Sequence, residues 1–473
     1  MIRNYIQKHK IFFAIISFAV IAHIGAFFTL KTLSVKFPNA LHSSFPITGG
    51  GFDSLQYATL AQNIIDYGTF SLEPKIDGNP ETFRTPGYPF FIATIEYFTG
   101  TIDAVPFFQI ILLMLSAFLI YSIAISISPD YKNIGLIAVG LFVFDPSLFL
   151  STQFLATECL YVTFLLASIY FLIKKTGSGR TNYTLAGIFY ALSAYVRPSG
   201  LYMAIPIGLW IAWRLFNSAN RKDILRFTGI FFLISFLLVY PWIARNGAKT
   251  GVYAFSSLDS YGSLNFNLPL YLSYKYEYER SIEEIRADIH RQIGGISDEE
   301  QMDLRNRPLI KDVVWNTLKP NLFSYGIFHI AKSVNFFFSP SLKHSIGSLK
   351  GFWEGQPQEP WRPEMSLANS LLDVRFGDVL LIFYQNILSI PESFFLLIMF
   401  VGGIYLYWND IWRNHSVKLI FLMIFFLALL TSPLSNHRYR VPVLPFMYIA
   451  GLAGTSLAIK KIKNRSRAIE NTN

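Results

Sequence analysis

The stretch VPFFQIILLMLSAFLIYSIAISI, residues 105–127, decides the fold class because it contains no charged side chain over its whole length. A helix needs about 20 predominantly apolar residues to cross the hydrocarbon core of a bilayer. Only 15% of the 473 residues are charged and the mean hydropathy is +0.38. Soluble domains usually carry about 25% charged residues. The sequence therefore predicts an all-α polytopic membrane protein.

Apolar runs of this kind recur along the chain, and we expect about ten membrane-spanning helices. With the amino terminus in the cytoplasm, the connections rich in Lys and Arg follow the even-numbered spans, as the positive-inside rule requires. Both termini are then cytoplasmic, and the first run is a retained span because no small-residue cleavage site follows it. The expected spans are residues 11–30, 104–127, 134–150, 157–173, 184–200, 201–215, 227–244, 380–408, 417–433 and 439–459.

Long polar segments separate some of these spans and fall on the outer side of the membrane in this topology. The first, residues 31–103, belongs to an N-terminal transmembrane module at residues 1–244. The second, residues 245–379, holds a predicted solvated amphipathic helix, KYEYERSIEEIRADIHRQI, and a predicted interfacial helix, NLFSYGIFHIAKSVNFFFSPS. Residues 380–473 complete the chain with the last spans and a basic cytoplasmic tail.

Several function classes are disfavoured by the composition and by missing motifs. The excess of 40 Lys and Arg over 30 Asp and Glu matches the basic loops of a membrane protein, so we expect no nucleic-acid partner. The single cysteine, Cys159, rules out a disulfide and a Cys-based metal site. The sequence has no Walker A, HExxH or GxSxG motif, and its eight His residues are scattered. Among the candidate functional groups, carboxylate and arginine side chains remain.

The stretch FDSLQYATLAQNIIDYG, residues 52–68, places an acidic side chain, Asp53, at the start of a predicted helix on the outer side. Gln56 stands three residues later, which is a capping-box spacing, so Asp53 has a purely structural interpretation as a helix cap. Three glycines upstream, residues 49–51, let the backbone approach a ligand closely, which favours a working carboxylate. Both interpretations stay open at this point.

Two further outer-side elements carry charge next to the membrane. In FRTPGYPFF, Arg84 precedes a turn fixed by two prolines and a glycine, and it is either a ligand for a specific anion or an anchor on ordinary lipid phosphate. In LATECLY, Glu158 lies at the outer end of an apolar span, where a carboxylate is costly unless it faces a cavity or a partner. The alternative for Glu158 is a local role at the start of the helix.

More cations lie at the same membrane depth, against the positive-inside trend. Because a guanidinium group makes two charge-assisted hydrogen bonds to phosphate, the set predicts a site for an anionic lipid headgroup. Each member alone has the alternative of a plain interfacial anchor. The members are Arg197 in AYVRPSG, Arg245 in YPWIARNG, and His437, Arg438 and Arg440 in NHRYRVPVLP, and Tyr57 and Tyr88 are further candidates for the site.

The order of the elements FDSLQYATLAQNI, FRTPGYPFF, LATECLY, YVRPSG, PWIARN and HRYRVPVLP covers nearly the whole chain. It resembles the bacterial GT-C glycosyltransferases akin to protein O-mannosyltransferases and the lipid A aminoarabinose transferase. The resemblance implies a GT-C-like helical bundle in the bacterial inner membrane that uses a polyprenyl-phosphate sugar on the outer side. It implies that Asp53 is the essential acidic residue of the first outer loop and that Glu158 is the second. It also implies donor-phosphate binding by Arg84, Arg197 and either Arg438 or Arg440.

The resemblance leads to an inverting glycosyl transfer in which Asp53 takes the proton from an acceptor hydroxyl, a contribution of about 10²–10⁴-fold in rate. The arginines would neutralise the departing lipid phosphate, and Glu158 would orient the acceptor or share the base role. The acceptor is a lipid, a glycan or a protein; no cofactor is implied, and a divalent cation stays open without a clear ligand set. Two other functions stay open: a transporter or flippase of lipid-linked sugars, and an O-antigen ligase or polymerase.

Overall fold

The structure, a computed structural model, describes residues 9–36, 52–174, 176–217, 220–276, 279–338, 394–408, 414–434 and 437–470. Within these ranges the chain forms helices joined by turns and contains no strand. The predicted fold class, an all-α polytopic membrane protein, is confirmed, whereas the number of ten spans stays a prediction. Five described helices are long and apolar enough to cross a membrane: Lys10–Thr32, Ile102–Ile127, Ser199–Phe216, Arg221–Thr250 and Arg438–Asn464. Three shorter apolar helices are Glu158–Ile173, Phe394–Trp408 and His415–Thr431.

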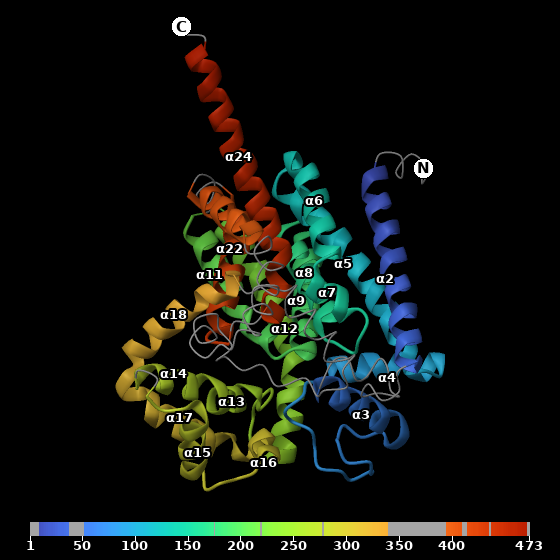
Figure 1. Ribbon diagram of the computed structural model, residues 1–473, viewed down its shortest axis with the longest axis vertical. Helices are drawn as coiled ribbons and strands as arrows, with labels where there is room; N and C mark the ends of the chain where they lie inside the picture. The colour runs from blue at the N-terminus through green and yellow to red at the C-terminus, as the bar shows by residue number, and fades with distance from the viewer. Residues whose placement is uncertain are drawn as a thin grey trace, which may run out of the picture.

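A bundle of apolar helices makes up the larger part of the molecule (Figure 1). Its members are α2 (Lys10–Lys36), α5 (Val105–Ile127), α6 (Lys132–Val143), α8 (Glu158–Ile173), α9 (Gly179–Val196), α11 (Ala204–Phe216), α12 (Arg221–Thr250), α22 (His415–Thr431) and α24 (Leu444–Glu470). In this bundle α8 packs between α5 and α9, α12 packs on α9, and α24 packs on α6. The start of α2 and the end of α24 lie at the same end of the molecule.

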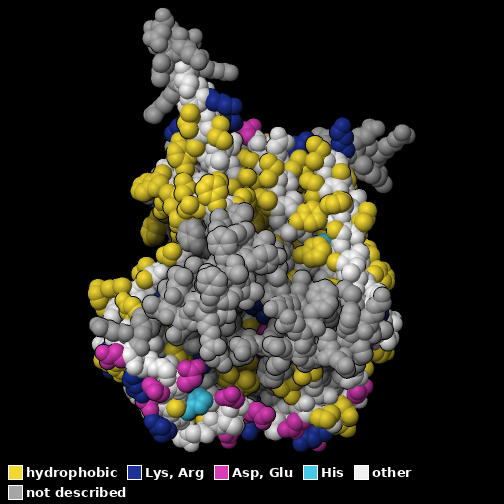
Figure 2. Space-filling view, in the orientation of Figure 1, with side chains coloured by type: hydrophobic (Ala, Val, Ile, Leu, Met, Phe, Trp, Pro, Cys, Tyr) yellow, Lys and Arg dark blue, Asp and Glu magenta, His cyan; other side chains and the backbone are white. Residues whose placement is uncertain are grey.

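The opposite end of the molecule holds the polar elements, and Figure 2 shows charged side chains there and hydrophobic ones over the bundle. Two helices of the first outer segment lie at this end, α3 (Phe52–Tyr67) and α4 (Gly87–Thr99). Beside them is an outer unit that consists of α13 (Leu258–Gly262), α14 (Leu268–Lys275), α15 (Ile282–Gln292), α16 (Asp298–Met302) and α17 (Arg307–Leu318). The helix α18 (Leu322–Phe338) then leads from the outer unit back to the bundle.

The outer unit has its own apolar core, which includes Leu268, Tyr271 and Ile310. The amphipathic helix predicted within residues 275–293 is α15. It starts at a capping box, because the Ser281 side chain accepts from the Glu284 N–H and the Glu284 side chain reaches back to the Ser281 N–H. One face of α15 then buries Ile282, Ile285 and Ile289 in the core.

The structure corrects the single helix predicted over residues 134–150, since α6 and a second helix, α7 (Pro146–Ser151), share this range. Asp145 separates them, and its Oδ1 accepts the backbone N–H groups of Ser147 and Leu148 at 3.0 and 3.4 Å. Pro146 starts α7 and has no N–H with which to continue α6. The Tyr448 hydroxyl of α24 donates to Asp145 Oδ2 at 3.2 Å, and this hydrogen bond connects the turn between α6 and α7 to α24.

The helix predicted over residues 184–200 ends earlier than expected. It is α9, and it stops at Val196 because the proline at position 198 disfavours a helical conformation at Arg197. Arg197 is extended, with φ −139° and ψ 129°. A short helix, α10 (Ser199–Tyr202), precedes α11, so the chain turns at the outer end of the bundle and leaves Arg197 at the turn.

The helix Phe394–Trp408 crosses α24 at glycines, which lets the two backbones touch. A Cβ atom on Gly454 would overlap the carbonyl oxygen of Gly402. We therefore expect Gly454→Ala to push the helices apart and to lower the free energy of unfolding by about 1–3 kcal/mol, measured by thermal unfolding in detergent. Gly403→Ala is the matched control, because its Cβ would meet only Phe421, at 3.9 Å. Equal unfolding midpoints for the two variants would contradict the close crossing.

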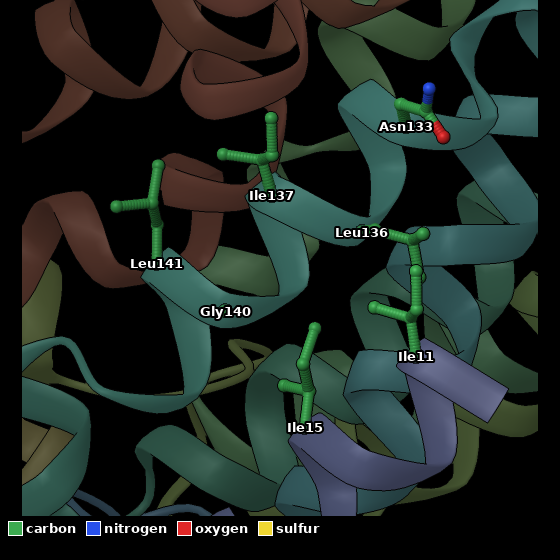
Figure 3. Close-up of a pocket in the computed structure, with 7 residues that line it drawn as sticks. All are labelled: Ile11, Ile15, Asn133, Leu136, Ile137, Gly140 and Leu141. Atoms are coloured by element: carbon green, nitrogen blue, oxygen red, sulfur yellow. The ribbon is translucent and has the colours of Figure 1, made fainter.

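A groove of about 470 Å³ lies between α2 and α6 (Figure 3). It is lined by Ile11, Ile15, Asn133, Leu136, Ile137, Gly140 and Leu141, and none of these residues is charged. Because Ile11 and Ile15 belong to the start of α2, the groove lies at the end of the bundle away from α3 and α4. It therefore does not belong to the carboxylate and arginine cluster described next.

Candidate active site

Asp53 lies in the first turn of α3 and forms an ion pair with Arg84. Arg84 Nη2 is 2.5 Å from Asp53 Oδ1, and Arg84 Nε donates to Gln56 Oε1 at 2.6 Å. Asp53 and Gln56 are three residues apart and share one helix face, so a single guanidinium group reaches both side chains. The Asp53 side chain is 40% exposed and Arg84 only 11%, which leaves the carboxylate accessible from one side.

The charges around Asp53 keep its carboxylate ionised. Burial pushes the pKa of the Asp53 carboxyl up, but attraction to Arg84, Arg438 and Arg197 outweighs it and holds the pKa below its ordinary value. Arg84 is in turn enclosed by two aromatic rings: its guanidinium carbon lies 5.3 Å from the Tyr57 ring centre and 4.7 Å from that of Phe83. Three arginines therefore attract the Asp53 carboxylate and stabilise its charged form.

The turn that carries Arg84 is fixed by a carboxylate that the sequence analysis did not identify. Glu81 Oε1 accepts the backbone N–H groups of Phe83 and Arg84 at 2.5 and 2.9 Å. Ser256 and Ser257, next to the outer unit, hold the same turn, with the Ser256 hydroxyl donating to the Phe83 carbonyl at 2.7 Å and the Ser257 N–H to the Thr82 carbonyl at 3.1 Å. The guanidinium of Arg84 is thus placed by a turn that is braced on two sides.

Glu158 is the first residue of α8, and its side chain is fully buried. Its Oε1 accepts from Arg438 Nε at 2.9 Å and lies 3.5 Å from Arg197 Nη1. Glu158 Oε2 and Arg197 Nη1 are both buried without a hydrogen-bond partner. Unpaired buried polar atoms are costly, and they are normally satisfied by water or a ligand. The buried carboxylate therefore faces a pair of arginines, and its role in the site stays a prediction.

The loop before Glu158 is held by buried polar side chains from other elements. Gln109 Nε2 of α5 donates to the last carbonyl oxygen of α7, at Ser151, and to two carbonyl oxygens of this loop, the shortest at 2.8 Å to Phe154. The Tyr88 hydroxyl donates to Gln109 Oε1 at 2.7 Å, and the Ser54 hydroxyl donates to the Leu155 carbonyl at 2.6 Å. Ser54 follows Asp53, so this bond sets the start of α3 against the start of α8. A polar residue inside the apolar run 105–127 was the only sequence signal for Gln109.

The two predicted tyrosines form a packed edge-to-face pair. The ring centres of Tyr57 and Tyr88 are 5.1 Å apart, and both side chains are buried. Tyr57 packs against Arg84, while Tyr88 supports Gln109. These contacts place both rings beside the charged groups, and a direct role of either tyrosine in the site stays a prediction.

Two of the predicted arginines face backbone carbonyls in this structure. Arg245 Nη1 donates to the Glu81 carbonyl at 2.9 Å, and its guanidinium carbon lies 4.6 Å from the Trp242 ring centre. Arg440 is 1% exposed and donates to the carbonyls of Phe336 and Phe337 at 3.4 and 3.3 Å. A role for either in phosphate binding stays a prediction. The side chain of His437 lies outside the described residues.

Five predicted residues form one cluster of two ion-paired groups, at the starts of α3 and α8, the turns at Arg84 and Arg197, and the short helix α23 (His437–Arg440). They are Asp53, Arg84, Glu158, Arg197 and Arg438. The two groups are near enough for Arg197 and Arg438 to attract the Asp53 carboxylate. Among the described residues, no group of three or more His, Cys, Asp or Glu side chains lies close enough to hold a metal ion. The cluster therefore offers two carboxylates and three guanidinium groups, a set suited to binding an organic phosphate.

Comparison with known families gives a match over residues 83–244 to the model described as dolichyl-phosphate-mannose-protein mannosyltransferase. The matched segment is less than half of the chain and contains Arg84, Glu158 and Arg197 of the cluster. A comparison with curated proteins gives no match.

The fold is similar to that of solved structures. The archaeal oligosaccharyltransferase AglB from Archaeoglobus fulgidus, in complex with an inhibitory peptide and a dolichol-phosphate, superposes with a TM-score of 0.54 at 13% identity over 99% of this chain. The chain has a GT-C fold. The chain spans 52% of the length of AglB.

Two further solved structures were matched to this chain. The Archaeoglobus fulgidus oligosaccharyltransferase in complex with Zn and sulfate has a TM-score of 0.50 at 14% identity, covering 95% of this chain and 50% of its own. ArnT from Cupriavidus metallidurans bound to undecaprenyl phosphate has a TM-score of 0.33 at 11% identity, covering 92% of this chain and 77% of its own. The expected resemblance to GT-C membrane glycosyltransferases is confirmed by the family match and the shared fold.

Proposed function

We propose that this GT-C protein is a membrane glycosyltransferase that takes a sugar from a polyprenyl-phosphate donor. The main support for this proposal is that Asp53 and Glu158 form ion pairs with three arginines at one end of the bundle. The five groups have one net positive charge, which suits the single negative charge of a phosphodiester. The match to dolichyl-phosphate-mannose-protein mannosyltransferases and the dolichol-phosphate bound to AglB support a lipid-phosphate donor.

The chemistry assigned to the site is transfer with inversion at the anomeric carbon. The acceptor hydroxyl, carried by a lipid, a glycan or a protein, attacks that carbon while Asp53 takes its proton. The bond between the sugar and the phosphate oxygen breaks, and the oxygen keeps the electron pair. Arg84, Arg197 and Arg438 stabilise the added negative charge, so the phosphate leaves without being protonated.

Glu158 acts through the arginines in this proposal. Its Oε1 is shared by Arg197 and Arg438, and the side chain has no exposed surface. A carboxylate in that position orients two guanidinium groups and keeps them from repelling each other. This assignment replaces the shared base role considered for Glu158 from the resemblance, and it leaves proton transfer to the more exposed Asp53.

We place the reaction on the outer face of a bacterial inner membrane, with both termini in the cytoplasm. The start of α2 and the end of α24 lie at the end of the bundle away from the cluster (Figure 1), and the end of α24 carries Lys460, Lys461 and Lys463. Basic segments favour the cytoplasmic side, which supports this orientation. A transporter would instead need charges along a path through the membrane.

The direct test supplies the full chain in vesicles with a radiolabelled polyprenyl-phosphate sugar and bacterial envelope extract. Loss of label from the donor and its appearance in a lipid, glycan or protein fraction is the expected result. The proposed function would be overturned if the donor stayed intact with every fraction of the envelope extract. A control glycosyltransferase in the same vesicles should consume its own donor, which shows that the vesicles support transfer.

Arg84→Gln should affect both the donor and the proton acceptor. The variant loses the guanidinium that binds Asp53 and faces the phosphate, so we expect kcat/KM for the donor to fall by about 10²–10³-fold. Burial of Asp53 remains while the largest favourable partner is lost, so the pKa of Asp53 rises. A base is inactive when protonated, so the acid limb of the activity profile should move to higher pH.

The measurement for Arg84→Gln is the pH profile of label transfer. Arg305→Gln is the matched control, because Arg305 is 49% exposed and pairs with Asp303 on the surface. We expect this control to keep the original rate and profile. An acid limb that stays in place in Arg84→Gln would contradict the proton-acceptor role of Asp53.

A further inference from the structure

The helix α18 presents an apolar stripe on its exposed side. The stripe consists of Phe323, Ile327, Ile330 and Val334, which are 83%, 49%, 63% and 53% exposed. Spacings of four, three and four residues place these side chains in one row along a helix. The opposite side of α18 is buried, with Phe328 at 1% exposure. The helix therefore has two apolar sides, and only one of them packs against the protein.

The position of α18 indicates what the stripe contacts. In its first half, Phe328 packs against Tyr271 of the outer unit, with ring centres 5.6 Å apart. Toward its end, α18 packs against α22 and α23 of the membrane bundle. The helix thus runs from the outer unit to the outer ends of the spans (Figure 1), where a bilayer changes from headgroups to hydrocarbon.

Two sets of hydrogen bonds connect α18 to the candidate active site. The Ser432 hydroxyl, at the end of α22, donates to the His329 carbonyl at 2.8 Å. Arg440 donates to the carbonyls of Phe336 and Phe337 at the end of α18. Arg438 lies two residues before Arg440 on α23, and it reaches Glu158. The short helix α23 therefore joins the end of α18 to the start of α8.

We propose that the α18 stripe lies in the hydrocarbon of the outer leaflet, with phospholipid acyl chains as its partner, and that this contact sets the position of Arg438. The bilayer holds the exposed side of α18 while the outer unit and α22 hold its buried side. The last carbonyls of α18 then fix Arg440, and through α23 they fix the side chain that binds Glu158. This inference concerns the lipid surface and does not depend on the proposed reaction.

The lipid contact is tested on the full chain in phosphatidylcholine vesicles with a nitroxide label at Ile327→Cys or Ile330→Cys. Ile76→Cys is the control, since Ile76 is 75% exposed in the first outer segment away from α18. Cys159 is 1% exposed, and labelling of the unchanged chain gives the background. The measured quantity is the ratio of the label's collision rate with oxygen to its collision rate with a water-soluble nickel chelate. This ratio should be at least threefold higher for the α18 labels than for the control label. Equal ratios would overturn the lipid contact.

The connection to Arg438 is tested by amide hydrogen exchange of residues 437–441 in the same vesicles. We expect about tenfold faster exchange in Ile330→Glu, because the charge lifts α18 out of the hydrocarbon, and no change in Ile76→Glu. Ser432→Ala, which leaves the stripe intact, should speed exchange in the same segment. Residues 158–173 of α8 report on general unfolding and should keep their rate. An unchanged rate at residues 437–441 in both Ile330→Glu and Ser432→Ala would overturn the connection.

Discussion

Asp53→Asn should lower the rate of sugar transfer by about 10²–10⁴-fold while the protein stays folded. The amide keeps the size of the side chain and can still accept a hydrogen bond from Arg84, but it cannot take a proton from the acceptor. Because the pKa of Asp53 lies below its ordinary value, the carboxylate is ionised at neutral pH and every turnover of the unchanged protein starts with a base present. The measurement is initial-rate transfer of label from a polyprenyl-phosphate sugar in vesicles.

Asp66→Asn is the matched control for this loss. Asp66 lies near the other end of the same helix, α3, and its carboxylate accepts from Gln62 at 2.8 Å on the surface. We expect this variant to keep the rate of the unchanged protein. A rate for Asp53→Asn within a factor of about three of the control would contradict the catalytic assignment and leave Asp53 with a structural role as the ion-pair partner of Arg84.

The sequence could not predict the direction in which each charged side chain points around its helix. Arg438 and Arg440 lie in one turn of α23, and the resemblance could not choose between them. Residues two apart on a helix do not share a face. In the structure, Arg438 reaches Glu158 and Arg440 binds the end of α18. Their positions in the sequence did not predict this difference in partners.

The supports of the site were harder to predict than its charges. Asp53 and Glu158 are exceptional in their local sequence, because a carboxylate next to an apolar run needs an explanation. Gln109 acts on backbone groups that lie 42 to 45 residues further along the chain, and a single sequence contains no record of those contacts. Glu81 acts on the turn two and three residues after it, but no local motif marks it. The break at Asp145 had a local signal, Asp followed by Pro, which the long apolar pattern around it concealed.

Glu158→Gln should both destabilise the protein and impair transfer. The variant leaves Arg197 and Arg438 side by side without the carboxylate they share. Removal of one partner of a buried ion pair costs about 3–5 kcal/mol, and we expect the lower value because Arg438 is 41% exposed. Thermal unfolding in detergent measures this loss. Glu96→Gln is the control, since Glu96 Oε2 is buried without a hydrogen-bond partner and no arginine depends on it; its stability should not fall.

A second substitution separates the two effects of Glu158→Gln. In the double variant Glu158→Gln with Arg438→Gln, one of the two uncompensated charges is removed, so about half of the lost free energy of unfolding should return. Transfer should stay low, because the phosphate now lacks a guanidinium that stabilises it as it leaves. If transfer recovered together with stability, Arg438 would have no part in binding the donor. If neither recovered, Glu158 would act on the substrate itself and not through the arginines.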